Sequence, residues 1–327
     1  MHADLLQLLA EPGTGAALEL EVSASEGDWI VEGALVSVRT GARFPIVDGI
    51  PRFVPAENYS ETFGWQWNRF RRTQIDSENG ASFSRDRFYD ETEWTPQQLE
   101  GKWVLDAGCG AGRFADVAAQ TGCRLVCLDY SSAIDAAKDT LAGKKNVDYV
   151  QASLLEPPFK PGVFDFVYCI GVIQHTPDPE LAVRNVSTLT REGGEYAMTI
   201  YARRPWTKLN AKYLIRPVTK RIPQDKLLSG IRTVMPAVFP VADRLFRLPV
   251  VGRVFQFTWP VAVYLDRDAL TPEDRYEESI LDTLDMLSPA HDHPMTASEV
   301  ESELEKAAGG QWRFKSRRPV NVIGTRA

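Results

Sequence analysis

Three closely spaced glycines lie between two carboxylates, and their spacing points to ligand binding. Asp106 follows a short apolar run and precedes Gly108, Gly110 and Gly112. Asp129 ends the next apolar run, 21 residues after Gly108. A glycine-rich turn after a strand lets backbone approach a ligand where a Cβ would clash. An acid at the end of the second strand can accept hydrogen bonds from the two hydroxyls of a ribose.

The spacing of this loop argues against two common phosphate-binding motifs. A dinucleotide fingerprint would place its third glycine at position 113, which is Arg113, and the Gly-Lys-Ser/Thr of a P-loop is absent. Asp106 would repel a pyrophosphate, but a carboxylate suits a cofactor without phosphate that carries a cationic sulfonium and an amino group. A merely structural glycine turn in another α/β protein is the alternative.

Alternating strand and helix patterns surround the loop. Such alternation implies right-handed crossovers and a parallel sheet, with ligands at the carboxyl ends of the strands near the switch in strand order. The predicted strands are residues 103–105, 124–128, 147–150, 164–170 and 196–201, with two more at 312–316 and 320–324, and the predicted helices are residues 113–120, 132–141, 179–189 and 296–307.

These motifs resemble those of the class I S-adenosylmethionine-dependent methyltransferases, above all the small-molecule branch that includes the ubiquinone and menaquinone enzymes. The matching residues are 104–114, 128–131 and 164–179. The resemblance covers residues 101–201, which would form the cofactor-binding core. It implies an α/β fold with a doubly wound, mostly parallel, seven-stranded Rossmann-like sheet, and S-adenosylmethionine as the cofactor.

The resemblance also implies which residues hold that cofactor. Residues 108–112 would line its methionine part, Asp129 would hold the ribose, and backbone around Cys169 and Ile170 would face the amino end. Ser153 stands where many relatives carry an aspartate that meets the adenine amino group, so a serine hydroxyl or a carbonyl would have to substitute. The expected cofactor-binding residues are Asp106, Gly108, Cys109, Gly110, Gly112, Asp129, Tyr130, Ser153, Leu154, Cys169, Ile170 and Gln66.

Methyl transfer depends mainly on positioning, with a base where the acceptor must lose a proton. His175 follows the fourth predicted strand, and an imidazole can accept a proton near neutral pH; a purely structural role in the loop is equally open. Tyr201 either orients the substrate or is scaffold. His291 and His293 are close in sequence, but no ligand spacing accompanies them and no metal site is expected.

Aromatic residues are frequent in the connecting segment, residues 58–100. Residues 63–70 resemble the lead-in helix that covers the cofactor pocket of related enzymes. Gln66 and Trp67 are therefore candidates for contact with adenosine or substrate. The alternative is that each tryptophan packs between the N-terminal unit and the core.

Residues 1–57 form a β-rich unit, with short strands predicted at 18–22, 29–31 and 34–38. Residues 44–51 resemble a run that follows a small zinc ribbon in many such enzymes. The positions of its four cysteines are occupied by Glu11, Thr14, Ser37 and Thr40. One carboxylate cannot make a structural zinc site. We expect a metal-free remnant that serves in packing or in a homodimer.

The C-terminal part predicts a helical substrate lid over residues 202–295, followed by the last helix and strands of the core over 296–327. Residues 203–226 contain eight Lys/Arg and one Asp, whereas residues 266–305 contain thirteen acids and two arginines. The basic segment either meets an acidic or lipid-linked acceptor, with peripheral membrane contact, or is a solvated face that pairs with the acidic segment.

Composition limits the classes of partner. The net charge of −7 over 327 residues does not favour nucleic acid, and no apolar run is long enough to span a bilayer. Four cysteines without a Cys-x-x-Cys pair indicate reduced thiols and a cytoplasmic protein. The sequence predicts methyl transfer to a small-molecule acceptor. The alternatives are a non-catalytic cofactor-binding or regulatory protein and, less favoured, a nucleic-acid or protein methyltransferase.

Overall fold

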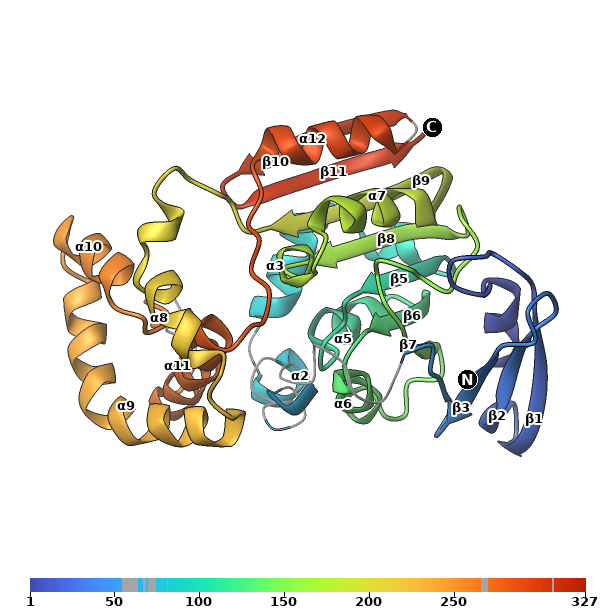
Figure 1. Ribbon diagram of the computed structural model, residues 1–327, viewed down its shortest axis with the longest axis horizontal. Helices are drawn as coiled ribbons and strands as arrows, with labels where there is room; N and C mark the ends of the chain where they lie inside the picture. The colour runs from blue at the N-terminus through green and yellow to red at the C-terminus, as the bar shows by residue number, and fades with distance from the viewer. Residues whose placement is uncertain (55–63, 67–68, 70–74, 81, 266–269, 308) are drawn as a thin grey trace.

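The protein consists of a central seven-stranded sheet, a four-stranded sheet at one end and a group of helices at the other (Figure 1). The computed structural model describes residues 1–54, 64–66, 69, 75–80, 82–265, 270–307 and 309–327.

The central sheet has the strand order β10-β11-β9-β8-β5-β6-β7. Only β11 runs in the direction opposite to the other six strands, so the predicted doubly wound, mostly parallel sheet is confirmed. The order switches at β5, which has β6 on one side and β8 on the other. The strands are β5 (Trp103–Ala107), β6 (Arg124–Asp129), β7 (Val147–Gln151), β8 (Phe164–Ile170), β9 (Thr190–Ile200), β10 (Gly310–Arg317) and β11 (Val320–Arg326).

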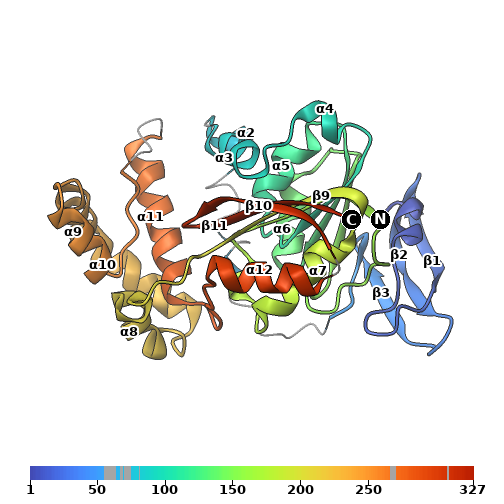
Figure 2. The ribbon, with the colours of Figure 1, turned by 90° about the horizontal axis from the view of Figure 1, so that it is seen from above.

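Helices cover both faces of this sheet. Successive residues of a buried strand pack against different helices, because their side chains point to opposite faces. Val104 packs in the cluster that contains residues of α3, α5 and α6, and Leu105 packs in the cluster that contains residues of α7 and α12. Figure 2 shows α7 and α12 on one side of the sheet and α3 and α5 on the other. These helices are α3 (Phe83–Thr92), α5 (Arg113–Ala119), α6 (Ala133–Thr140), α7 (Pro179–Leu189) and α12 (Ala297–Lys306); the short α2 (Asp76–Asn79) and α4 (Pro96–Leu99) precede β5.

The strand β9 is longer than its apolar pattern predicts, since it begins at Thr190 and not at residue 196. Gly193 and Gly194 lie in the added part of the strand, where the register with β8 shifts. A Cβ on Gly194 would lie 2.6 Å from the carbonyl oxygen of Asp165. The glycines therefore accommodate a β-bulge with a close backbone approach.

The N-terminal unit is an antiparallel sheet of β1 (Leu18–Glu26), β2 (Trp29–Ser37), β3 (Arg43–Val47) and β4 (Ile50–Pro51). The two strands predicted at 29–31 and 34–38 are one strand, β2. Gly33 interrupts the apolar pattern because a Cβ there would lie 2.2 Å from the carbonyl oxygen of Glu21 on β1. Arg52 joins the unit to the core by hydrogen bonds to Gln151 at 2.8 Å and Asp135 at 2.7 Å.

The four positions that correspond to zinc ligands lie together in this unit. One oxygen of the buried Glu11 carboxylate accepts hydrogen bonds from Thr14 at 2.5 Å and Ser37 at 2.8 Å, and the other accepts one from Thr40 at 2.5 Å. The Thr14 and Thr40 hydroxyls, in that order, hold the pKa of Glu11 below its usual range. Hydrogen bonds to one carboxylate thus join the four positions.

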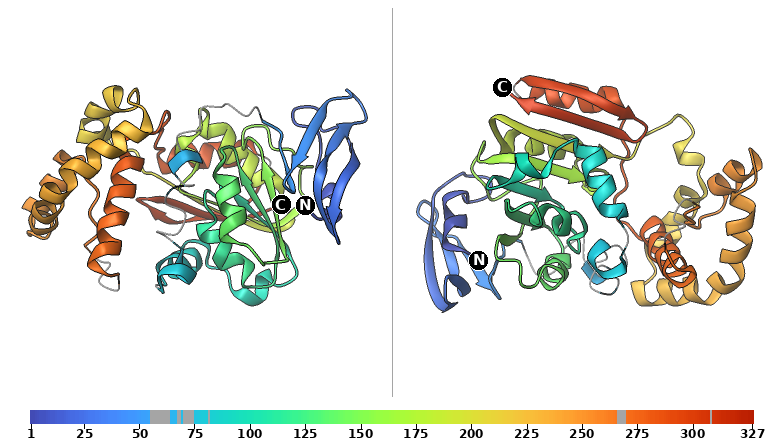
Figure 3. Two further views of the ribbon diagram at one scale, coloured as in Figure 1. Left: turned by 90° about the horizontal axis from the view of Figure 1, so that it is seen from below. Right: turned by 180° about the vertical axis from the view of Figure 1, so that it is seen from behind.

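The lid comprises α8 (Ala211–Thr219), α9 (Gln224–Phe246), α10 (Val251–Thr258) and α11 (Pro272–Leu287). Apolar residues of α9 and α11 form its own core. Trp65 packs against that core, so the expectation that it packs between the N-terminal unit and the sheet is wrong. Figures 1 and 3 place the lid and the N-terminal unit at opposite ends of the molecule. No helix in the described part of the chain is long and apolar enough to cross a membrane.

Candidate functional site

A cavity of about 390 Å³ lies at the carboxyl ends of the parallel strands, beside the switch in strand order. The glycine loop after β5, the end of β6, the segment after β8 and the lid all contribute to its wall. This is the position at which open α/β sheets bind ligands.

Most of the residues expected at the cofactor contribute to this wall. The loop contributes Gly108, Cys109 and Gly110. All four cysteines of the chain, Cys109 among them, are free thiols and buried. Contact with the cofactor remains a prediction for each of these residues. The expected residues found in the wall are Gly108, Cys109, Gly110, Asp129, Tyr130, Leu154, Ile170 and His175.

Five expected residues do not line the cavity. Asp106 and Cys169 are buried within the sheet. Gly112 begins α5 and faces Ala137. These three residues lie behind the wall.

The other two have different partners. The Ser153 hydroxyl accepts the N–H of Leu155 at 3.1 Å, so it closes a local turn. Gln66 is buried, and its amide nitrogen lies 3.4 Å from an Asp285 carboxylate oxygen. Gln66 therefore supports a wall residue of the lid. Trp67 lies outside the described residues.

Asp129 closes the glycine loop onto the neighbouring strand. One carboxylate oxygen accepts the N–H of Gly110 at 2.9 Å, and the other accepts the N–H and hydroxyl of Ser131 at 2.8 and 2.7 Å. Burial raises the pKa of Asp129, and these hydrogen bonds oppose the rise. The second acid and the glycine bend therefore meet, as the sequence predicts.

Gly108 meets a steric requirement that other residues cannot meet. Its φ is +95°, and a Cβ at this position would lie 2.5 Å from a methyl group of Val172. The N–H groups of Gly108 and Cys109 both donate to the carbonyl oxygen of Leu128, at 2.8 and 3.0 Å. These contacts bring the loop close to β6 and the segment after β8.

Asp106 lies beneath the loop as a buried acid. Burial raises its pKa to about 8; the Tyr168 hydroxyl opposes the rise and the charge of Asp129 adds to it. At neutral pH this carboxyl is mostly protonated, so the region behind the glycine loop carries less negative charge than the two acids suggest.

His175 is held by a segment that is distant in sequence. Its Nδ1 lies 3.0 Å from the carbonyl oxygen of His291. Because a carbonyl only accepts, Nδ1 carries the proton, and the lone pair of the neutral ring is on Nε2. The ring stands edge-on to Tyr201, with centroids 5.7 Å apart. His291 thus contributes its backbone to the site.

We name residues 288–295 the strap, since this segment runs from α11 to the edge of the core. His293 donates its N–H to the carbonyl oxygen of Gln174 at 2.7 Å, and Met295 donates to that of Tyr201 at 3.0 Å. The Asp292 side chain, 1% exposed, pairs with Arg216 and with Lys212 of α8. Burial alone would raise the pKa of Asp292, but the two cations outweigh it and hold the pKa low.

Sequence reasoning missed two groups in the cavity wall. Tyr264, Asp282 and Asp285 reach it from the lid. The acids are three residues apart on α11, which places them on one face of the helix; they had been considered only as partners for the basic segment. That pairing occurs at other acids: Lys212 and Arg216 pair with Asp292, and Arg203 pairs with Glu299.

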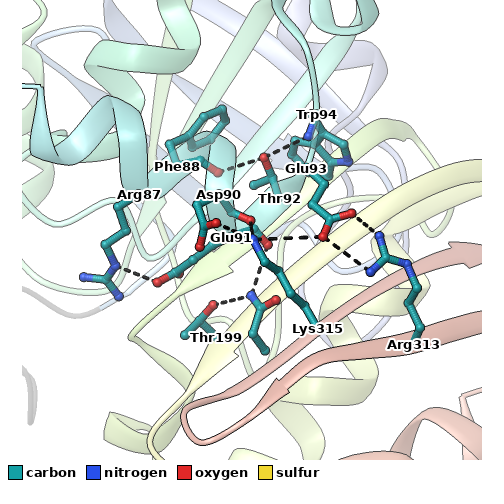
Figure 4. Close-up of polar contacts among 11 residues, drawn as sticks. Arg87, Phe88, Asp90, Glu91, Thr92, Glu93, Trp94, Thr199, Arg313 and Lys315 are labelled. Atoms are coloured by element: carbon teal, nitrogen blue, oxygen red, sulfur yellow. Dashed lines mark hydrogen bonds and ion pairs between the residues drawn. The ribbon is translucent and has the colours of Figure 1, made fainter.

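Arg87 is the second missed contribution, and α3 holds it in place. Arg87 bonds to Glu91 one turn later at 2.7 Å, and this spacing was the available sequence signal. Figure 4 shows how β10 secures the same helix: Arg313 pairs with Glu93, and Lys315 pairs with Asp90. Helix α3 is thereby fixed against the sheet edge with Arg87 at the cavity.

Comparisons with known proteins define the class. Residues 105–198 match the family model described as a methyltransferase domain. The core of this chain is a class I S-adenosylmethionine-dependent methyltransferase domain. The glycine cradle and the buried acid beside it fit that cofactor.

Individual relatives match part of the chain. The ubiquinone biosynthesis O-methyltransferase of Escherichia coli strain K12 is 35% identical over 129 residues, which are 37% of this chain and 54% of that protein. The chain thus spans about half the length of the curated relatives it matches.

Solved structures show more distant similarity. A SAM-dependent methyltransferase from Aquifex aeolicus is 13% identical, with 82% of this chain and 97% of that chain covered and a TM-score of 0.40. Human N-acetylserotonin methyltransferase, solved with SAM, is 14% identical, with 84% and 60% covered and a TM-score of 0.43. No group of three or more His, Cys, Asp or Glu side chains within the described ranges is placed to hold a metal ion.

Proposed function

We propose that this chain transfers the methyl group of S-adenosylmethionine to a small-molecule acceptor. The supporting observation is that one cavity has Asp129 and the glycine loop on one wall and His175 with lid residues on another. The cofactor supplies a methyl group on a sulfonium, which is already a good leaving group. The protein's task is to align the acceptor with that methyl and to exclude water.

His175 is the proposed base. The His291 carbonyl holds the ring with its proton on Nδ1, so Nε2 can accept the proton of an acceptor hydroxyl or amine. Tyr201 and Tyr264 would orient the acceptor through ring contacts and hydroxyl hydrogen bonds, since both line the cavity. Cys109, Tyr130, Leu154 and Ile170 would enclose the cofactor. A cytoplasmic location and a homodimer remain predictions.

The acceptor is proposed to be acidic or lipid-linked. This proposal rests on the side chains that the acceptor would meet where it passes the lid on its way to the cavity. A second hollow of about 380 Å³ lies between the lid and the core, and it shares Tyr201 with the first. Arg204, Lys212 and Arg318 line it, without any acidic side chain. An acceptor with a carboxylate or phosphate would be attracted there.

The test compares wild type with His175→Asn and His175→Ala in a radiolabelled-methyl assay against cell extract. Asparagine can still donate to the His291 carbonyl, but it cannot serve as a base. Labelled product with wild type and a loss of about 100-fold in both variants would support the proposal. Undiminished transfer by His175→Asn would remove His175 as the base.

Calorimetry with S-adenosylmethionine tests cofactor binding separately from methyl transfer. Wild type that binds the cofactor but labels nothing in the extract would favour the non-catalytic alternative.

A further inference from the structure

We propose that the outer face of the lid binds the surface of a bilayer that contains anionic phospholipid. We define this outer face by exposed apolar residues of the 3-10 turn η3 (Thr207–Leu209), of α8, α9 and α10, and of their connections. The proposal concerns where the enzyme works and does not depend on which acceptor it methylates.

Exposed apolar side chains are concentrated on this face. Of the fifteen large apolar side chains exposed on the described chain, eleven lie between residues 206 and 254. They are Trp206, Leu209, Leu214, Ile215, Val218, Val234, Val241, Leu248, Val250, Val251 and Val254. Scattered exposed hydrophobics are ordinary, but a gathering of this kind marks an interaction site.

Helix α8 shows the pattern most clearly. Ala211, Arg216 and Thr219 are buried against the rest of the lid. Leu214 and Val218, one turn apart, are 67% and 64% exposed. The helix is therefore apolar on the side turned away from the protein, which is the reverse of an ordinary surface helix.

Helix α9 continues the same arrangement. Ile231 and Met235 pack in the lid core, whereas Val234 and Val241 are exposed. Since they are seven residues apart, Val234 and Val241 lie on one side of the helix. Figure 1 shows α9 and α10 at the end of the molecule farthest from the N-terminal unit.

Charge identifies the occupant of this face. Residues 203–254 contain twelve Lys/Arg and two Asp, in a chain whose net charge is −7. Several of these cations have acidic partners, but seven form no ion pair within the described part of the chain. The seven are Arg204, Lys208, Lys220, Arg221, Lys226, Arg244 and Arg253.

Apolar side chains among unpaired cations match an anionic bilayer, which takes the former into its interface and the latter among its head groups. A second copy of this chain fits less well, because a two-fold contact would bring the same unpaired cations together. The acidic remainder of the chain would be repelled by the membrane, so the lid would face it.

The experiment measures co-sedimentation of the full chain with vesicles of phosphatidylcholine alone or with about one-third phosphatidylglycerol. Leu214→Glu/Val218→Glu should weaken binding to the anionic vesicles at least tenfold. The matched control is Val22→Glu/Val38→Glu on the N-terminal sheet, where the side chains are 53% and 57% exposed. It adds the same charge at similar exposure and should bind as wild type does.

A second variant, Lys220→Gln/Arg221→Gln, keeps the apolar side chains. Its affinity for the anionic vesicles should fall, while its affinity for vesicles of phosphatidylcholine alone should stay that of wild type. Calorimetric binding of S-adenosylmethionine checks that each variant is folded. The proposal is overturned if wild type does not bind anionic vesicles, or if the control variant loses binding equally. It is also overturned if wild type is a dimer and the Leu214→Glu/Val218→Glu variant is a monomer. The same holds if the protein binds duplex DNA through this face but does not bind vesicles.

Discussion

The carboxylate of Asp129 accepts the backbone N–H of Gly110 at 2.9 Å, and this bond joins the end of β6 to the loop that follows β5. Asp129→Ala removes this bond and a hydrogen-bonding group of the cavity wall. Because hydrogen bonds to charged groups contribute about 1.5–3 kcal/mol, S-adenosylmethionine should bind roughly 10- to 100-fold more weakly. Titration calorimetry measures this, with the exposed Glu156→Ala as control. Equal affinity in both variants would refute the assigned pocket.

Gly108 should not tolerate a side chain. Gly108→Ala places a Cβ 2.5 Å from Val172 at a φ of +95°, so the loop must shift and cofactor affinity should fall at least tenfold. Gly143→Ala is the matched control, because its φ is +86° with no atom within 4 Å of the new Cβ. If Gly108→Ala bound the cofactor as well as Gly143→Ala does, the close approach to Val172 would not explain the glycine at position 108.

The ion pair between Asp292 and Arg216 should be a major contributor to lid stability. Asp292→Asn leaves the Arg216 guanidinium, 9% exposed, without its counter-charge, which should cost about 3 kcal/mol of unfolding free energy. Glu277→Gln breaks the exposed pair with Arg232 and should cost less than about 1 kcal/mol. Urea denaturation compares the two. Similar costs would show that the buried pair contributes no more than a surface one.

Asp292 also predicts a pH dependence. The folded-state pKa of Asp292 is lowered, so its stabilising effect is complete above the unfolded pKa and is lost as the pH falls through the folded value. The difference in unfolding free energy between wild type and Asp292→Asn should therefore be smaller in acid than at neutral pH.

Asp106 predicts the opposite pH dependence. Its pKa is raised from 3.8 to about 8, so the unfolded chain ionises this group while the folded chain holds it protonated. Asp106 should thus reduce stability progressively as the pH rises between these two values. Asp106→Asn should flatten that slope, whereas the exposed Asp28→Asn should not. Parallel slopes for wild type and Asp106→Asn in urea denaturation across this range would contradict the raised pKa.

The Glu11 cluster should become a metal site with four substitutions. Glu11→Cys, Thr14→Cys, Ser37→Cys and Thr40→Cys, made together, place four thiolates where one carboxylate now gathers three hydroxyls. The combined variant should bind one equivalent of Zn²⁺ or Co²⁺ tetrahedrally, which the Co²⁺ thiolate absorption reports. Absence of binding would show that the four positions do not meet in a tetrahedral arrangement.

The core of this protein could be predicted from the sequence, because the relevant signals are local. The glycine triplet, the acid at the end of β6 and the apolar runs each act over a few residues, where periodicity and backbone sterics dominate. The predicted strand at 164–170 and the predicted helix at 179–189 have the bounds of β8 and α7. The helix predicted at 296–307 is α12 (Ala297–Lys306), and the capping box of Thr296 and Glu299, likewise local, starts it.

The side chains that complete the cavity could not be predicted in this way, because they come together through long-range packing. His175 takes its orientation from His291, 116 residues away, and Asp285 reaches the wall through the packing of the lid. Gln66 and Ser153 were assigned to the cofactor from sequence, yet their polar groups contact Asp285 and Leu155. Such contacts depend on how distant segments pack together, and hydrophobic patterning specifies the face that an element buries but not its partner there.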